Sequence, residues 1–361
     1  MDHILAIGTN KYMVALRNLV IPTASLLVIT VIYYVSSKHK KMKNISVLFI
    51  FLILMLELFR FGWKYTPFSS RNLVYPKTPV LEYLMNLEKP YRVTGTDVIP
   101  MNMRMQYRIE TPEGYDAVYP QSIAQYVASS GSENVNASPA GKYGFIDRED
   151  SKLVDLINTK YLLALKKDSE GKPSKDGSIP DKYQDTSKYK LSFEDKSVVV
   201  IERNNAYPRA FMVYEWEYID NDKEILRKLL DDNFPLRSKV ILHGLGEKPV
   251  QTDEDGESIV SYSKYSAMES SIEVETNKPG MLFVSDLHYP GWKAFIDEQE
   301  VNIYRANYSF RAIEVPKGKH TVRFSYKPES FYLGLRISAV TLIVLILFLG
   351  LEIKSLARLR K

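Results

Sequence analysis

The chain alternates between long apolar runs and one long polar stretch. Three predominantly apolar runs are present, at Leu19–Val35, Ile45–Phe61 and Phe331–Leu351. Each is about as long as a helix needs to cross a hydrocarbon core of roughly 30 Å. The stretch between the second and third runs, Lys64–Ser330, is polar. The pattern predicts a membrane protein with three transmembrane helices, the lipid bilayer as a partner and one large region outside the bilayer.

Basic residues cluster in the turn between the first two runs and in the C-terminal tail. Loops rich in Lys and Arg stay in the cytoplasm. We therefore expect both clusters in the cytoplasm and Lys64–Ser330 on the outer side of the cell membrane, in a multi-pass protein. The clustered residues are Lys38, Lys40, Lys41 and Lys43 in the turn, and Lys354, Arg358, Arg360 and Lys361 in the tail.

The first part of the outer region mixes helical and strand patterns. Asn221–Asp232 carries leucine and isoleucine residues at helical spacing, with acidic residues early, which is typical of an amphipathic helix. Lys152–Lys160 also has a helical pattern, whereas Lys196–Ile201 and Ala210–Tyr214 are short apolar runs of strand length. The sequence predicts an extracytoplasmic α+β domain here.

Beyond about Ser238 the helical pattern stops. Short strand-like segments recur, separated by turn signals such as Lys278-Pro279-Gly280 and Pro290-Gly291. Many short strands with regular turns are typical of a β-sandwich. The predicted fold class is a membrane protein with α+β structure and a C-terminal β-sandwich. The predicted domains are 1–63 with transmembrane helices at about 19–35 and 45–61, the α+β domain at 64–237, the sandwich at 238–329, and 330–361 with a transmembrane helix at about 331–351 and a basic tail.

Composition limits the chemistry. The net charge of +5 is mostly accounted for by the two basic clusters, so no nucleic-acid partner is expected, and cysteine is absent, so no disulfide can form. The five histidines show no metal-ligand spacing and no cofactor motif is present. The acidic triplet Asp253–Asp255 could belong to a metal loop, but Tyr262 stands where such a loop needs a bidentate acid. We favour a solvated turn for it, and expect no metal, no cofactor and no catalytic residue.

One polar pair lies inside the second apolar run. Glu57 and Arg60 are three residues apart, so they share a helical face and can pair. Ionisable residues in spans are costly and often functional, which would make the pair a contact for a lipid-linked substrate. The alternative is a snorkelling pair near the outer interface beside Trp63 and Tyr65.

Several motifs resemble a known family. They are most specific near the C-terminus and looser before it. The chain resembles the C-terminal part of bacterial YfhO-family membrane proteins, from about Arg92 onward. The matching segments are His288–Ala294, Ala306–Ala312, Val315–Val322, Tyr326–Pro328, Glu113–Asp116, Leu153–Leu163, Tyr207–Phe211 and Asp231–Val240.

The resemblance implies a link to polytopic GT-C-type glycosyltransferases, which move sugars from polyprenyl-phosphate carriers onto cell-envelope polymers. Such enzymes hold catalytic acids in a first outer loop, and no equivalent loop is found in this sequence. The expectation is an accessory or substrate-handling region, as a fragment or split form without the catalytic half and inactive as an enzyme alone. Its expected partners are a polytopic GT-C-type protein and an envelope glycopolymer. The alternative is a structural or partner-binding envelope protein without catalysis.

Turn aromatics in the last third are the best ligand candidates. Tyr289, Trp292 and Tyr308 lie in or beside predicted turns, where rings could stack on sugars. Asn307 and Arg311 would add hydrogen bonds to such a ligand. The alternative is that Trp292 and Phe310 are core residues, because large rings dominate protein cores, and that Tyr289 caps the turn.

Overall fold

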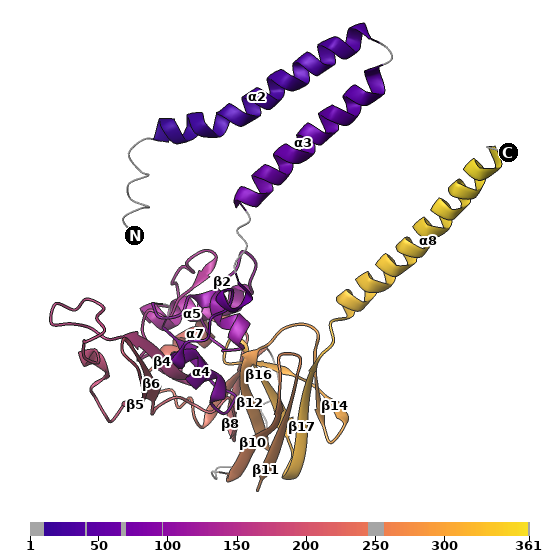
Figure 1. The fold of residues 1–361 in the computed structure, drawn as a ribbon. Coiled ribbons are helices and arrows are strands. Elements are labelled where there is room, and N and C mark those ends of the chain that lie inside the picture. Colours follow the sequence, from indigo (N-terminus) through magenta and orange to yellow (C-terminus); the bar gives the residue numbers. More distant parts are fainter. Residues whose placement is uncertain (1–10, 40–41, 66–69, 96, 245–255, 360–361) are drawn as a thin grey trace. The chain divides into compact units, whose positions relative to one another are not determined.

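The computed structural model describes residues 11–39, 42–65, 70–95, 97–244 and 256–359. The chain divides into two compact units that meet at residues 76 and 77. Figure 1 gives the order of their helices and strands.

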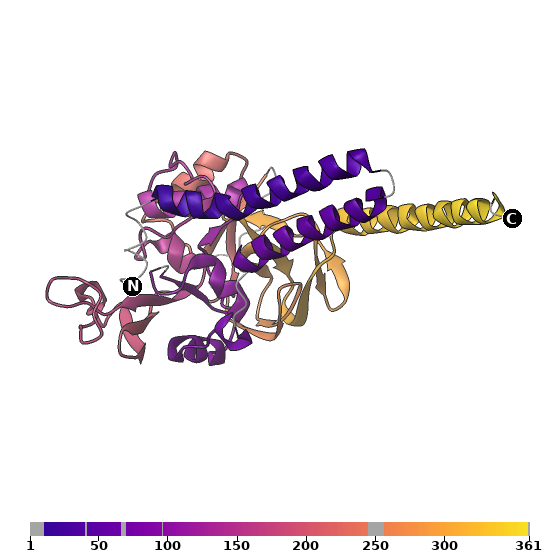
Figure 2. The ribbon, with the colours of Figure 1, turned by 45° about the horizontal axis from the view of Figure 1, so that its top comes forward.

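The first unit is a helical hairpin. Helices α2 (Lys11–Lys38) and α3 (Lys43–Tyr65) contain apolar segments long enough to cross a bilayer, at Asn18–Lys38 and Lys43–Trp63. Most of their apolar side chains point outward, as a lipid environment requires. The two helices of this hairpin are drawn in indigo in Figures 1 and 2. A short 3-10 turn, η3 (Arg71–Leu73), follows.

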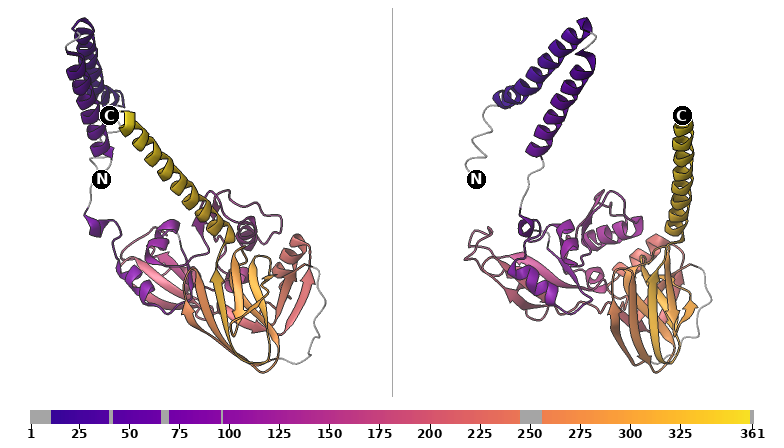
Figure 3. Two further views of the ribbon diagram at one scale, coloured as in Figure 1. Left: turned by 90° about the vertical axis from the view of Figure 1, so that its right-hand side faces the viewer. Right: turned by 45° about the vertical axis from the view of Figure 1, so that its right-hand side comes forward.

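The third apolar helix belongs to the second unit. Helix α8 (Glu329–Leu359) contains the candidate span Glu329–Leu351 and continues directly from the last strand (Figure 3). Three membrane-length helices and a large β-rich region confirm the predicted fold class, a membrane protein with α+β structure. Localisation in a membrane follows from these helices, while the side on which the second unit lies stays a prediction.

The second unit begins with a mixed sheet covered by helices. The four strands run in the order β1-β4-β6-β5, in which β1 and β4 are parallel and the other neighbours antiparallel. Apolar residues of helix α4 pack with those of β1, β4 and β6 in one core. The elements are α4 (Pro79–Asn86), β1 (Arg92–Thr94), η4 (Met101–Tyr107), β2 (Gly114–Tyr115), α5 (Gln121–Ser132), β3 (Tyr143–Gly144), α6 (Lys152–Leu156), β4 (Thr159–Leu165), η5 (Asp181–Tyr183), β5 (Tyr189–Glu194) and β6 (Val198–Arg203).

Two further sheets follow along the chain. The six-stranded sheet has the order β7-β12-β16-β15-β9-β8, and the five-stranded sheet has the order β10-β11-β17-β13-β14. One hydrophobic core contains buried residues of both, for example Leu282 and Ile313 from the first and Ile272 and Phe324 from the second. The two sheets therefore face each other across this core. The strands are β7 (Ala210–Val213), β8 (Glu215–Ile219), β9 (Lys239–His243), β10 (Ser258–Tyr265), β11 (Glu269–Thr276), β12 (Gly280–Leu287), β13 (Trp292–Ile296), β14 (Gln299–Val301), β15 (Tyr304–Ala306), β16 (Phe310–Val315) and β17 (Gly318–Tyr326).

The predicted amphipathic helix is confirmed as α7 (Asp222–Leu230), which buries Ile225, Leu226 and Leu229. Its first turn is capped by Asn221, whose side-chain oxygen accepts hydrogen bonds from two backbone N–H groups. The helix packs on the six-stranded sheet in a core shared with α5 and α6.

The sheets cross the domain boundary predicted at residue 238. Strands β7 and β8 precede that residue, yet β7 pairs with β12 and β8 pairs with β9. The backbone hydrogen bonds of these strands are satisfied only within the six-stranded sheet. The division of the outer region into two domains stays a proposal, and strand pairing favours placing it between β6 and β7.

The paired sheets are joined to the membrane helix by a very short link. Strand β17 ends at Tyr326 and α8 begins at Glu329. Trp292 pairs with Tyr326 in the sheet, and the backbone N–H of Lys327 donates to the carbonyl of Gly291 at 2.7 Å. Gly291 has a φ of +101°, and a Cβ there would lie 3.0 Å from Cα of Pro328. The turn before β13 therefore packs directly on the link to the membrane helix, and this approach requires glycine.

Candidate functional site

Two hollows lie beside the segment that connects the two sheets, between β14 and β15. Both are lined by Val301, the last residue of β14, and by Asn302 of this segment, so they adjoin there. The second hollow includes Trp292 at the start of β13, and the first includes Ile296 at its end. Because Trp292 pairs with Tyr326, the second hollow is next to the link to the membrane helix and the first is farther from it.

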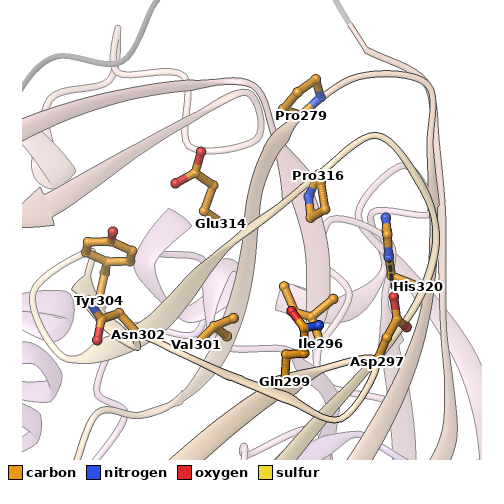
Figure 4. A pocket seen from close by; sticks show the side chains of 10 residues that line it. All are labelled: Pro279, Ile296, Asp297, Gln299, Val301, Asn302, Tyr304, Glu314, Pro316 and His320. Atoms are coloured by element: carbon orange, nitrogen blue, oxygen red, sulfur yellow. Dashed lines mark hydrogen bonds and ion pairs between the residues drawn. The ribbon is translucent and has the colours of Figure 1, made fainter.

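The first hollow has a volume of about 640 Å³ and a mixed polar and apolar lining (Figure 4). His320 and Asp297 form a pair at one end, with Nδ1 and Oδ2 2.7 Å apart. The hydrogen bond from His320, and then one from the backbone N–H of Thr321, hold the pKa of the Asp297 carboxyl below its usual value. Glu314 and Tyr304 lie at the other end in Figure 4. The lining residues are Pro279, Ile296, Asp297, Gln299, Val301, Asn302, Tyr304, Glu314, Pro316 and His320.

These side chains suit a ligand rich in hydroxyl groups. Carboxylates accept hydrogen bonds, amides both donate and accept them, and imidazole does either according to its tautomer. The apolar floor, with Ile296 and Val301, can cover the C–H face of a sugar ring. The first hollow therefore combines the groups that a neutral, polyhydroxylated ligand needs.

The second hollow has a volume of about 240 Å³. Its wall contains Arg311, whose guanidinium stacks at 4.0 Å from the ring centre of Trp292. Lys293 forms an ion pair with Glu300 at 3.1 Å, and both side chains are partly exposed. The lining residues are His288, Tyr289, Pro290, Gly291, Trp292, Lys293, Glu300, Val301, Asn302, Ile303 and Arg311.

Behind this wall lies a buried charge cluster centred on Asp286. Its Oδ1 receives hydrogen bonds from Arg209 at 2.8 Å and faces Arg92 at 3.6 Å, while Oδ2 binds Arg311 at 3.0 Å. Arg209 also pairs with Glu110 and donates to the hydroxyl of Tyr265 at 2.8 Å. The cluster joins β1 of the mixed sheet to β12 and β16 of the six-stranded sheet.

The cluster shifts the pKa values of its members. Burial opposes ionisation of Asp286, but Arg209, Arg311 and Arg92 outweigh it and hold the carboxyl pKa below its usual value. Burial lowers the pKa of Arg311, although Asp286 acts against it. Burial and then Arg209 lower the pKa of Arg92 to about 10. Arginine stays protonated in proteins, so all three guanidinium groups are charged at neutral pH.

The structure brings three of the five predicted ligand residues together. Tyr289, Trp292 and Arg311 line the second hollow, with the ring of Tyr289 exposed and Arg311 almost fully buried. Asn307 and Tyr308 line neither hollow. The side-chain oxygen of Asn307 accepts a hydrogen bond from the backbone of Ile241 at 2.9 Å, and Tyr308 packs in the core with α5 and α7. A ligand role for these five residues stays a prediction.

In the first unit the predicted Glu57–Arg60 pair forms at 3.0 Å. Glu57 also accepts a hydrogen bond of 2.7 Å from the hydroxyl of Ser25 on α2. The carboxylate therefore links the two helices of the hairpin, a connection that the sequence did not indicate. Its possible role in substrate contact stays a prediction.

The acidic partners of the site were missed at the sequence level. Asp286 follows the apolar run Met281–Val284 after one serine, and a charge that continues an apolar strand is a signal of a buried ion pair. No group of His, Asp and Glu that could hold a metal occurs among the residues that the structure describes. Asp253–Asp255 lie outside those residues.

Comparison with known proteins agrees with the sequence motifs. Residues 251–338 match the family model described as bacterial membrane protein YfhO. The matched region contains strands β13 to β17, whose residues contribute to the lining of both hollows, and the beginning of α8. It is a YfhO-family region. No curated protein and no solved structure matched the chain. The resemblance is thus confirmed over residues 251–338.

Proposed function

We propose that the chain is a membrane-anchored extracytoplasmic region that handles substrate for a YfhO-like system. Such a system would transfer sugars from polyprenyl-phosphate carriers to cell-envelope polymers. The chain would hold a ligand while a polytopic GT-C-type partner, or a further part of a longer transferase, supplies the catalytic base. The family match over residues 251–338 supports the general class.

The observation that carries the proposal is the placement of the two hollows. They adjoin at Val301 and Asn302, and the second begins at Trp292 beside the link to α8. From Tyr326 to His320 on β17, six residues of strand span about 20 Å. A ligand held in the membrane by its lipid end could therefore reach the first hollow with a polar head group of two or three sugar rings.

The proposal predicts that neutral saccharides bind in the first hollow. The test uses the full chain, purified in a detergent without sugar groups, and saturation-transfer NMR with neutral mono- and disaccharides. Gln299→Ala and Glu314→Gln remove exposed polar groups from the lining. Gln184→Ala and Glu275→Gln are matched controls, because both residues are exposed and lie outside the hollows.

Loss of saccharide signal in the two lining variants, with both controls unchanged, supports the proposal. A second measurement adds the chain to membranes that contain a polytopic transferase and a polyprenyl-phosphate sugar, and follows sugar transfer. The chain should raise transfer only when the transferase is present. Failure of every saccharide to bind, together with no effect on transfer, would leave a structural envelope role as the better account.

A further inference from the structure

The cluster around Asp286 carries more positive than negative charge. Three guanidinium groups, those of Arg92, Arg209 and Arg311, are matched by two carboxylates, Asp286 and Glu110. Side-chain exposure is 3% for Arg209 and 2% for Arg311. A buried charge without a counter-charge is costly, so the surplus favours an anion nearby.

Hydrogen-bonding capacity is also left over in this cluster. Among the described residues, Nε and Nη1 of Arg311 and Nη1 of Arg209 are buried and have no hydrogen-bond partner. Buried N–H groups are nearly always paired, so an unpaired one favours an acceptor nearby. Two of the three orphan groups belong to Arg311, which lines the second hollow.

The surplus positive charge lies in the wall of the second hollow, at Arg311. The guanidinium of Arg311 lies between the rings of Trp292 and Phe324, 4.0 and 4.9 Å from their centres. The side chain of Arg311 is 2% exposed, so water screens its charge poorly. The positive charge also acts on His288 in the lining, because burial and then Arg305 and Arg311 lower the pKa of its imidazole. At the mouth, Lys293 adds a second cation, which Glu300 partly offsets.

We propose that the second hollow is an anion site that takes the phosphate group of an amphiphile at the bilayer surface. The buried charge of Arg311 favours an anion in the hollow, and the partly exposed Lys293 can bind a phosphate oxygen directly. The link between Tyr326 and Glu329 keeps the hollow next to the membrane helix. The inference rests on the proposed function and deepens it. The sugar end of a ligand would lie in the first hollow and its phosphate in the second.

The test compares ligands with and without phosphate. The full chain in a neutral detergent is titrated calorimetrically with farnesyl phosphate, farnesol, inorganic phosphate and short-chain phosphatidylglycerol. Farnesyl phosphate should bind at least about tenfold more tightly than farnesol, and the difference should shrink with added salt. Arg311 itself is left unchanged because its loss would disturb the core.

Variants of Lys293 and Glu300 should change the affinity for farnesyl phosphate in opposite directions. Lys293→Gln should weaken farnesyl phosphate binding about fivefold, and Glu300→Gln should strengthen it about fivefold. A fivefold change corresponds to about 1 kcal/mol, which is the energy of two unit charges about 4 Å apart in water. Binding of farnesol should not change. Lys319→Gln and Glu275→Gln are the matched controls, because these residues form an exposed ion pair at 3.0 Å elsewhere on the same sheet.

The outcomes distinguish a lipid phosphate from free phosphate. They also distinguish failure of the anion site from failure of the proposed saccharide-handling function. Tighter binding of inorganic phosphate, phosphatidylglycerol or farnesyl phosphate than of farnesol sustains the anion site and identifies its source. Equal binding of farnesyl phosphate and farnesol, with no response to the Lys293 and Glu300 changes, overturns the anion site. If saccharides still bind in the first hollow, the proposed function survives that result.

Discussion

Asp286 and Arg209 are 77 positions apart in the sequence, yet Nε of the arginine donates to the carboxylate at 2.8 Å. The side chain of Arg209 is 3% exposed and that of Asp286 is 15% exposed. The contact connects parts of the second unit that the sequence pattern assigned to different domains.

Removing the charge of Asp286 should destabilise the contact between these parts of the second unit. Asp286→Asn leaves three buried guanidinium groups with only Glu110 as an acidic partner, which should lower the free energy of unfolding by about 3–5 kcal/mol. The measurement is chemical denaturation of the full chain in detergent, followed by circular dichroism. Glu275→Gln, which alters an exposed ion pair, is the control. A loss below that of the control would mean that the cluster contributes little to stability.

Trp292 should be a packing residue whatever ligand it meets. Its ring packs on Tyr326 with ring centres 5.2 Å apart and on the guanidinium of Arg311. Trp292→Ala should cost about 3 kcal/mol, at the low end for such changes because the ring is only partly buried. Trp292→Phe should recover most of that loss. A melting temperature of the alanine variant within a degree or two of the parent would contradict this prediction.

His288 should make the fold less stable in mildly acidic solution. Burial lowers its pKa, and Arg305, Arg311 and His243 add to the shift. The unfolded chain then binds more protons than the folded chain below the unperturbed pKa of about 6.5, so stability falls as pH drops from there towards the folded pKa. Unfolding free energies at pH 7.5 and 5.5 should differ less in His288→Gln than in the parent. An identical difference in both proteins would refute the assignment.

The hydrogen bond between Ser25 and Glu57 should hold the helical hairpin together. Ser25→Ala should weaken the association of α2 with α3 by about 0.5–2 kcal/mol, as interhelical hydrogen bonds in membranes do. Thr30→Ala is the matched control, because the hydroxyl of Thr30 donates to Leu26 of its own helix. Titration with dodecyl sulfate, followed by energy transfer between dyes on the two helices, measures the effect. Equal effects of both changes would show that the bond contributes nothing specific.

Topology can be tested by labelling, since the chain has no cysteine of its own. Cysteines placed at Ser174 and Ser37 should differ in intact cells, with an impermeant thiol reagent reaching residue 174 and not residue 37. Labelling of residue 37 alone would reverse the predicted orientation. Labelling after permeabilisation controls for reactivity at both positions.

The membrane helices and many strands follow from the sequence because local pattern alone decides them. An apolar run of about 20 residues has one stable environment. In β11 every second residue is buried, including Ile272 and Val274, so its period reveals the strand. The pairing of β7 with β12 could not be read in this way. Strand partners depend on distant segments, which is why the sheets cross the boundary predicted at residue 238.

The candidate site was only partly visible for the same reason. Tyr289 and Trp292 belong to one turn and could be singled out together. The partners of Asp286 come from residues 92, 209 and 311, and no local pattern links them. Asn307 has the left-handed backbone of a turn residue, with a φ of 42°, but its side chain is occupied by the backbone of β9. Turn position alone therefore did not distinguish a ligand-facing residue from a structural one.

The short link between Tyr326 and Glu329 limits how far the paired sheets can move from the membrane helix α8. Its few residues extend at most about 10 Å, and the hydrogen bond from Lys327 to Gly291 shortens it further. The second hollow therefore samples only a thin layer along the bilayer surface. A lipid-borne ligand diffuses in that same layer, so its effective concentration at the hollow exceeds its concentration averaged over the surrounding volume. Weak contacts in the hollow would then be sufficient for capture.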